Sequence, residues 1–330
     1  MTPNNCFAAI TGWGMAVPPR VLTNSDLEQI VETSDEWIRS RTGVIERHVL
    51  SEGEKPSQLG AQAAKEALEK AGLDVGEVDT IVVTTCTGDR SIPATANSVQ
   101  HLLGNDTAAA FDVNGGCVGF IYGLQIATSM ISTGAAERAL VVAAEGLTRF
   151  TDYTDRSTCV LFGDGGGAIV LEPSSREEGC LASKFSSDAS AIELLTVPGG
   201  MAERPASHDT VDSRLHYLKM EGAEVFRRAV VGMEQTVRAL LDETKTSLDE
   251  IQLVVPHQAN KRIIDALAKR LELSHDKVVC NIERYGNTSS ATIPIALAEA
   301  VSEGRLDKGD LVLLVAFGAG LSVGSALVRW

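Results

Sequence analysis

The sequence lacks clustered cysteines and a surplus of basic residues, and each absence excludes a class of protein. Its six cysteines are scattered singly, with no C-x-x-C pair and no Cys/His cluster at metal-ligand spacing. Acidic residues outnumber basic ones by 44 to 29, so the formal net charge of −15 opposes nonspecific attraction to nucleic acid or anionic membranes. We therefore expect no metal site and no nucleic-acid or membrane partner, and the scattered thiols are typical of a reduced cytoplasmic protein.

Apolar runs suited to a membrane span or a secretory signal are also missing. The first residues, MTPNNCFAAITGWGM, carry no basic region and no proper apolar core, so no secretory signal is expected. Residues 311–328 form an uncharged run of 18, but three glycines and two serines interrupt it. This interruption favours two buried strands joined by a Gly-rich turn over a bilayer helix.

What is present is typical of a globular α/β protein. The 330 residues, 44% of them hydrophobic and 22% charged, can bury a dry core and favour two domains or one large domain. Short β-branched runs alternate with longer helical patterns, which predicts layered α/β architecture. The expected strands cover residues 80–84, 139–143, 168–171, 253–255 and 311–316.

The pattern also repeats within the chain. Two strand patterns recur at an offset of 173, pairing residue 77 with 250 and residue 139 with 312, and a helix end recurs at an offset of 170, pairing residue 131 with 301. A polar, Pro-containing stretch near residue 175 separates the copies. We predict two similar halves, residues 1–175 and 176–330.

Cys117 is the candidate nucleophile of the first half. It stands in the segment DVNGGCVGF, directly before a helical pattern over residues 120–132. The positive end of a helix dipole stabilises a thiolate, so this position predicts a lowered pKa for the Cys117 thiol. The flanking glycines let the backbone turn and leave the sulfur approachable. The remaining cysteines are interpreted as buried structural thiols: Cys6, Cys86, Cys159, Cys180 and Cys280.

His257 and Asn287 are the candidates of the second half. His257 follows an apolar strand in VVPHQAN, at the carboxyl end where ligands of α/β sheets gather. Asn287 lies in YGNTS, a segment that is also ordinary turn and cap chemistry. At the offset of 170, Asn287 falls on Cys117, so we expect the two to begin equivalent helices and to face one site.

A cysteine, a histidine and an asparagine also describe a papain-like protease, and the separation of 140 residues between Cys117 and His257 is in its range. That family places its cysteine near the mature N-terminus in a C-G-S-C-W type of signature, usually with disulfides. None of these features is present in the sequence, and a repeat of two α/β halves does not suit that fold.

Five motifs together resemble the β-ketoacyl-acyl carrier protein synthase III family, the condensing enzymes of the thiolase superfamily that start type II fatty acid synthesis. They are, in order, TSDEWIRSRTG, DVNGGCVGF, VPHQAN, YGNTS and FGAGLSVGSALV, and they span nearly the whole chain. The resemblance implies a five-layered α-β-α-β-α thiolase fold of two halves related by a pseudo-twofold axis. It also implies a homodimer.

The resemblance further implies ping-pong chemistry. Cys117 would take an acyl group from acyl-CoA, and malonyl-acyl carrier protein would then lose CO2 to an enolate stabilised by His257 and Asn287. The backbone N–H groups of Cys117 and Ala319 would hold the tetrahedral oxyanion. The family often has glycine where this chain has Ala319, so a negative φ is required there. Acyl-CoA is a substrate, and no cofactor is implied.

Binding residues are implied by the same motifs. Those expected at CoA are Trp37, Arg41, Arg156 and Asn260. Those expected at the acyl pocket are Leu147, Phe162, Leu195 and Ile92, the last standing where a phenylalanine is often supplied across the dimer. The acidic carrier protein needs a local basic patch on this acidic chain, for which the expected residues are Arg227, Arg262, Lys269 and Arg270.

Two alternatives remain beside the condensing enzyme of fatty acid synthesis. One is a specialised acyltransferase or condensing enzyme of secondary metabolism with the same fold. The other is a catalytically silent scaffold subunit, against which the joint presence of Cys117, His257 and Asn287 argues.

Overall fold

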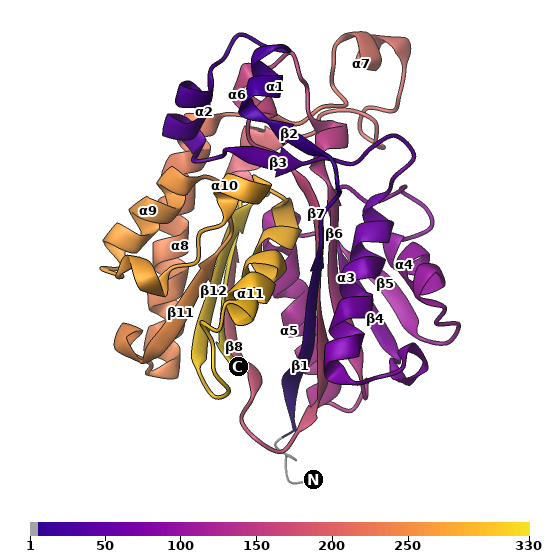
Figure 1. Cartoon of the computed structure of the whole chain (residues 1–330), viewed down its shortest axis with the longest axis vertical. Coiled ribbons are helices and arrows are strands. Elements are labelled where there is room, and N and C mark those ends of the chain that lie inside the picture. Colours follow the sequence, from indigo (N-terminus) through magenta and orange to yellow (C-terminus); the bar gives the residue numbers. More distant parts are fainter. Residues whose placement is uncertain (1–5) are drawn as a thin grey trace.

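A computed structural model describes residues 6–330 of the chain (Figure 1). The first five residues, on which the expected absence of a secretory signal partly depends, lie outside the described part. Nine strands form one sheet in the order β11-β12-β13-β8-β1-β7-β6-β4-β5. Their bounds are β1 (Phe7–Ala16), β4 (Thr80–Thr84), β5 (Ala109–Val113), β6 (Ala139–Gly146), β7 (Asp164–Ser174), β8 (Gly179–Ser187), β11 (Ile251–Pro256), β12 (Leu311–Gly318) and β13 (Ser322–Arg329).

The strand order is mirrored between the two ends of the sheet. On one side β5, β4 and β6 are parallel and β7 is antiparallel to both β6 and β1. On the other side β11 and β12 are parallel and β13 is antiparallel to both β12 and β8. The two sides meet in a single bridge between Ala8 and Gly179. The two sides therefore have similar topology, and residue 175, the predicted boundary, lies in the loop between β7 and β8.

The sheet has two sides, β5-β4-β6-β7-β1 and β8-β13-β12-β11. Helices cover the outer face of each side and fill the space between the two sides, as Figure 1 shows. α5 and α11 form the central layer, because α5 contacts β4, β6, β8 and β13 while α11 contacts β1, β7 and β11. α3 packs on β1, β6 and β7, and α8 packs on β8, β12 and β13. The expected five-layered α-β-α-β-α fold is therefore confirmed. The bounds are α3 (Pro56–Ala71), α4 (Thr95–Leu103), α5 (Gly119–Ser132), α8 (Gly222–Thr244), α9 (Lys261–Arg270) and α11 (Thr292–Ser302).

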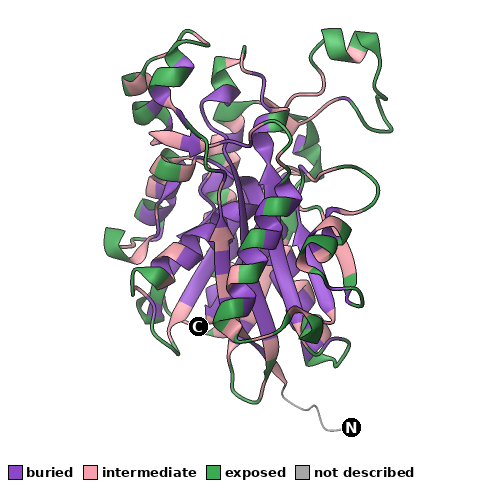
Figure 2. Ribbon diagram, turned by 45° about the vertical axis from the view of Figure 1, so that its right-hand side comes forward, coloured by how far each residue is buried: buried purple, intermediate pink, exposed green. Residues whose placement is uncertain are grey.

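The burial of the strands explains the hydrophobic patterns in their sequences. Every residue of β4 and β6 is buried, which accounts for unbroken apolar runs without alternation (Figure 2). The uncharged run at residues 311–328 forms the antiparallel hairpin of β12 and β13, as expected from its glycines. Among residues 6–330, no helix has both the length and the apolar character needed to cross a bilayer.

Smaller elements gather at one end of the molecule, at the top of Figure 1. α10 contacts β3 there, and β3 pairs with β2. Of these elements, α2, α6, β9 and β10 contribute residues to the cavity described below. Their bounds are β2 (Val21–Thr23), α1 (Asn24–Glu28), α2 (Asp35–Thr42), β3 (Glu46–His48), α6 (Arg156–Cys159), β9 (Leu195–Thr196), α7 (His208–Asp212), β10 (Lys219–Met220) and α10 (Ile282–Tyr285).

The expected equivalence of Cys117 and Asn287 is wrong. α5 follows the 3₁₀ turn η2 (Gly116–Val118) and α11 follows η7 (Ser289–Ala291), so the two turns begin 173 residues apart. α5 has 14 residues and α11 has 11, which is why their ends differ by only 170. The topological counterpart of Cys117 is therefore Ser290, and Asn287 stands two residues before η7.

The contact between β1 and α3 requires a bare backbone, and this gives the first prediction. A Cβ on Gly12 would stand 2.0 Å from the carbonyl oxygen of Ala67. Gly12→Ala should lower the free energy of unfolding by about 2 to 3 kcal/mol, because α3 would have to move off the sheet. Urea unfolding followed by circular dichroism measures the loss.

Gly76→Ala is the matched control, since a Cβ on Gly76 meets no atom within 4 Å. It should change the free energy of unfolding by less than about 0.5 kcal/mol. Equal losses in the two variants would contradict the close approach of α3 to β1.

Candidate functional site

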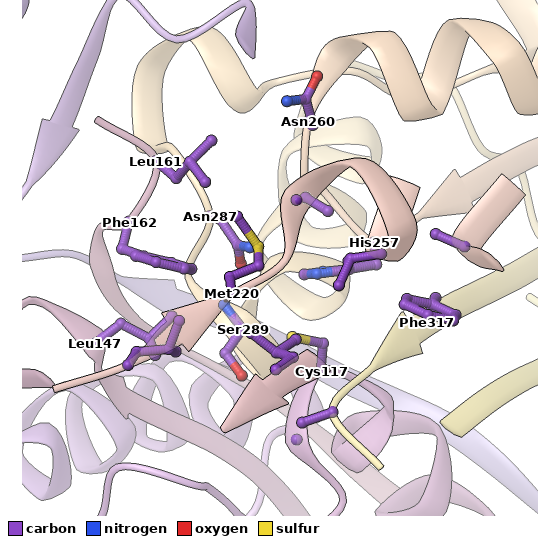
Figure 3. A pocket seen from close by; sticks show the side chains of 18 of the residues that line it. Cys117, Leu147, Leu161, Phe162, Met220, His257, Asn260, Asn287, Ser289 and Phe317 are labelled. Atoms are coloured by element: carbon purple, nitrogen blue, oxygen red, sulfur yellow. Dashed lines mark hydrogen bonds between the residues drawn. The ribbon is translucent and has the colours of Figure 1, made fainter. Parts of the chain in front are cut away.

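A cavity of about 1310 Å³ lies where the two halves meet (Figure 3). Cys117, His257 and Asn287 all line it, although they are distant in the sequence. Trp37 and Arg41 lie along the same cavity. The three residues predicted to react are therefore brought together around one space.

Cys117 is held at the junction of η2 and α5. Gly116 adopts a φ of 52°, which turns the backbone into the helix at low cost. A Cβ on Gly318 would stand 2.8 Å from the amide nitrogen of Cys117. The end of β12 thus packs directly against the candidate nucleophile, and only glycine permits that approach.

The expected low pKa of Cys117 is wrong for the free site. Burial raises the pKa of this thiol to about 12, since the thiolate would lose its hydration in the cavity. A hydrogen bond with Ser289 acts in the opposite direction, and the charge of Glu145 adds to the rise. The position before α5 is as expected, but burial is the largest influence on the pKa and favours the neutral thiol before substrate binds.

His257 directly follows β11 and is buried. Its backbone N–H donates to the carbonyl of Val315 at 2.8 Å, and its Nδ1 lies 2.7 Å from Oγ1 of Thr292. The ring is thereby oriented with Nε2 left for the cavity. Burial lowers the pKa of His257 to about 3, so the imidazole is neutral at physiological pH.

Hydrogen bonds hold the backbone N–H, the backbone carbonyl and the side-chain Oδ1 of Asn287. Its N–H donates to the carbonyl of Leu161 at 2.9 Å, and its carbonyl accepts from the N–H of Gly163 at 3.0 Å. Its Oδ1 accepts from the backbone N–H of Ser289 at 2.8 Å. The Nδ2 donor is consequently the group that Asn287 can offer to a ligand.

Ala319 lies in the turn between β12 and β13 and lines the cavity beside Cys117. It is not among the residues with positive φ, so its methyl group is tolerated as the sequence required. Within residues 6–330, neither the N–H of Ala319 nor that of Cys117 donates to another residue. Two backbone donors are thus free beside the sulfur, the arrangement needed for an oxyanion.

Of the residues expected at CoA, Trp37, Arg41 and Asn260 line the cavity, whereas Arg156 is outside its lining and lies against Trp37. The guanidinium of Arg156 stacks on the Trp37 ring at 4.9 Å, which leaves no room for a third planar group between them. Asn260 begins α9, and its Nδ2 donates to the carbonyl of Arg41 at 3.1 Å. An adenine could enter between Trp37 and Arg156 only if the two side chains separated.

The residues expected at the acyl pocket divide into two groups. Leu147, Phe162 and Leu195 line the cavity within this chain. Ile92 lies in the loop before α4, outside the cavity, and is 85% exposed. A role for Ile92 in acyl binding would therefore require a second copy of the chain.

The four basic residues expected at the carrier protein lie on α8 and α9, which pack together. Arg227 is paired with Glu224 at 2.6 Å, and Arg270 is paired with Glu234. Lys269 forms no ion pair within the described residues, and Arg262 stacks on Phe226 at the rim of the cavity with 5.5 Å between guanidinium and ring.

Cys86, Glu145 and Ser289 lie near Cys117 and were not among the predicted site residues. Cys86, interpreted above as a buried structural thiol, instead lines the cavity and is exposed to it. Its Sγ lies 3.5 Å from Oγ of Ser289 and 3.7 Å from both carboxylate oxygens of Glu145. Glu145 is buried and accepts from Thr87, Thr85 and Ser290. The sequence signal that points to this group is a glutamate, Glu145, within the otherwise apolar strand β6.

Comparisons with known proteins agree along the whole chain. The model of 3-oxoacyl-[acyl-carrier-protein (ACP)] synthase III matches residues 111–189, and the model of its C-terminal part matches residues 241–330. The chain is 51% identical over 324 residues to beta-ketoacyl-[acyl-carrier-protein] synthase III of Roseiflexus castenholzii, covering 98% of each chain. It is 49% identical to the protein of the same name from Symbiobacterium thermophilum, covering 97% of each.

Solved structures give the same result. The crystal structure of 3-oxoacyl-[acyl-carrier-protein] synthase III from Aquifex aeolicus has a TM-score of 0.90 at 45% identity, over 98% of this chain and all of that one. The priming beta-ketosynthase of the R1128 polyketide biosynthetic pathway has a TM-score of 0.92 at 34% identity, over 100% of this chain and 98% of that one.

The raised pKa of Cys117 predicts how the free thiol reacts. With a pKa of about 12, the thiolate fraction should rise about tenfold per pH unit between pH 7 and 9. Alkylation by iodoacetamide, followed by peptide mass mapping of Cys117, should rise in the same proportion. A rate that levels off near pH 7 would show a low pKa. Cys86→Ser serves as the control, because it removes the second thiol of the cavity.

Proposed function

The chain belongs to the 3-oxoacyl-[acyl-carrier-protein] synthase III family and is thus a condensing acyltransferase, and we propose that it joins an acyl-CoA primer to malonyl-acyl carrier protein. The product is a β-ketoacyl-acyl carrier protein that starts fatty acid synthesis. The observation that supports this most strongly is the convergence of Cys117, His257 and Asn287 on one cavity.

Cys117 acts as the nucleophile of the first half-reaction. Its sulfur attacks the thioester carbonyl, and the oxyanion is stabilised by the N–H groups of Cys117 and Ala319. The bond between the carbonyl carbon and the CoA sulfur then breaks. The departing CoA thiolate takes up the proton that Cys117 loses, so the half-reaction releases no net proton.

His257 and Asn287 act in the second half-reaction. The malonyl group loses CO2, and the enolate oxygen accepts hydrogen bonds from Nδ2 of Asn287 and from Nε2–H of His257. In the neutral imidazole this tautomer requires Nδ1 to accept the hydroxyl proton of Thr292, which lies 2.7 Å away. A neutral imidazole with a pKa of about 3 is consistent with this role. An imidazolium would be a stronger proton donor and would quench the carbanion before it attacks the acyl group on Cys117.

The substrates occupy the two ends of the cavity. CoA extends past Arg41 and Asn260, with its adenine between Trp37 and Arg156 once these separate. The primer chain lies against Leu147, Phe162 and Leu195. No cofactor takes part, and CoA enters as a substrate.

A homodimer would complete the acyl pocket. β5 pairs on one side only, with β4, and so leaves a strand edge on which a second copy can continue the sheet. The same association would bury the exposed Ile92 and bring it to the partner's acyl pocket. We place this dimer in the cytoplasm.

A second candidate is a condensing enzyme of secondary metabolism with the same mechanism. The likeness to the R1128 priming beta-ketosynthase favours it, at a TM-score of 0.92. A panel of acyl-CoA primers of different length and branching would distinguish the two by which primer acylates Cys117.

Removing the Asn287 donor separates the two half-reactions. In Asn287→Ala, acylation of Cys117 by acyl-CoA, followed by intact mass, should proceed as in the wild type. Release of CO2 from malonyl-acyl carrier protein should fall about a hundredfold, as expected when one oxyanion donor is lost.

Cys117→Ala is the control and should form no adduct. No acyl adduct on wild-type Cys117 with any primer would overturn the proposed function. An adduct that never yields ketoacyl product would favour an acyltransferase with another acceptor.

Arg262 and Lys269 give a prediction for carrier-protein docking. Reversing both to glutamate should raise the KM for malonyl-acyl carrier protein by about tenfold, because the carrier is acidic and these two cations have no carboxylate partner in the described residues. Acylation from acyl-CoA should be unchanged.

A charge-matched control reverses Lys65, exposed on α3, and Lys245, exposed at the far end of α8. It should leave the KM for malonyl-acyl carrier protein at its wild-type value. If acylation falls along with docking, or if the control behaves like the test variant, the patch is assigned wrongly.

A further inference from the structure

Arg47 is a fully buried arginine that the mechanism above does not use. It lies in β3, with a relative exposure of 0%. Its hydrogen-bond acceptors are three neutral oxygens: the carbonyl of Leu22 at 3.1 Å, Oδ1 of Asn24 at 2.9 Å and the carbonyl of Val160 at 2.7 Å. Within residues 6–330 no carboxylate pairs with it, and its Nε has no partner.

Burying such a charge lowers the stability of the fold. A buried cation loses its hydration, and without a carboxylate it gains no ion pair in return. Burial accordingly lowers the pKa of Arg47 to about 10. An apolar side chain of similar length would avoid this cost, so the stability of the fold does not explain the guanidinium. Its explanation lies in the segments that it joins.

The first of these segments is the loop over residues 160–163. Nη2 of Arg47 holds the carbonyl of Val160, and the next residue, Leu161, accepts the N–H of Asn287. Gly163 then donates to the carbonyl of Asn287, so Phe162 and Asn287 form a short parallel bridge. The guanidinium therefore anchors the strand-like loop that positions the Asn287 backbone.

The stem of Arg47 packs under the same pairing. A Cβ on Gly163 would lie 3.2 Å from Cβ of Arg47, and a Cβ on Gly286 would lie 3.3 Å from it. Gly286 has a φ of 64° and directly precedes Asn287. Both strands of the pairing thus rest on the Arg47 side chain.

The second segment is α2, which carries Trp37 and Arg41. Asn24 accepts from Arg47 through Oδ1 and donates through Nδ2 to Oδ1 of Asp35 at 2.8 Å. Asp35 is the first residue of α2. One amide side chain therefore joins the buried guanidinium to the helix at the CoA end of the cavity.

We propose that Arg47 is a positioning residue for the condensation, which holds the loop over residues 160–163 and, through it, places the Asn287 amide at the enolate oxygen. It also ties this loop to α2 through Asn24. Arg47 touches no substrate and acts only through these neighbours. The proposal rests on the proposed function, because it assigns Asn287 to the decarboxylation step.

The test measures the two half-reactions separately in Arg47→Met and Arg47→Lys. Methionine keeps much of the stem and removes every donor, whereas lysine keeps the charge and one of the donor directions. Loss of CO2 from malonyl-acyl carrier protein should fall at least about tenfold in kcat with methionine and less with lysine, because a small displacement of a catalytic amide is costly. The maximal rate of Cys117 acylation should stay within about twofold of the wild type, with a higher KM for acyl-CoA.

Asn105→Ala is the matched control. Asn105 is also buried and holds four backbone groups, at Val75, Val78, Thr107 and Ala108, but it does not line the cavity. It should lower thermal stability and leave both half-reactions of the folded protein unchanged.

Two results overturn the positioning role: wild-type decarboxylation in Arg47→Met, or equal loss of acylation and decarboxylation in both Arg47 variants. If the methionine variant does not fold, the lysine variant decides by the same split. Failure of the wild-type enzyme to acylate at all would instead overturn the proposed function, and the two failures are thereby distinguished.

Discussion

The contact between η2 and η7 at the centre of the molecule is the constraint on which the site depends. These two turns lead into α5 and α11, and each begins with a residue at a φ of 52°, Gly116 in one and Ser289 in the other. Ser289 is held in this unusual conformation by the hydrogen bond from its N–H to Asn287, while Ser290 bonds to Glu145 of the other half. Because the turns meet, the sulfur of Cys117 and the amide of Asn287 reach one cavity from opposite halves.

Burial decides the charge state of the groups that this contact assembles. It raises the pKa of Cys117 to about 12 and lowers that of His257 to about 3, so both are neutral before substrate arrives. A site of this kind stabilises charge that develops on the substrate with hydrogen-bond donors rather than with resident ions. Arg47 follows the same principle farther from the substrate. This buried cation donates to the neutral carbonyls of Leu22 and Val160 and thereby fixes the loop over residues 160–163 beneath Asn287.

Much of the fold and the identity of the central residues could be predicted from the sequence. The apolar run at residues 80–84 is β4, and the uncharged run at residues 311–328 is a hairpin with a glycine-rich turn. Cys117 and His257 could be singled out because a cysteine before a helix and a histidine after a buried strand occupy positions that local patterns reveal. The residues that surround and position them could not be predicted from the sequence. Cys86 was misread as a structural thiol, and the Glu145 and Arg47 side chains show their partners only when distant segments are in contact.

The layered α/β architecture, the internal repeat and the residue types available for chemistry can be predicted from the sequence, because they follow from periodicity and from short motifs. The behaviour of those residues depends on the packing of distant segments. The tertiary structure showed that α5 is longer than α11, so Asn287 is no counterpart of Cys117. It also reversed the expected pKa of Cys117, since a helix dipole is a local property whereas loss of solvent depends on every segment that closes the cavity.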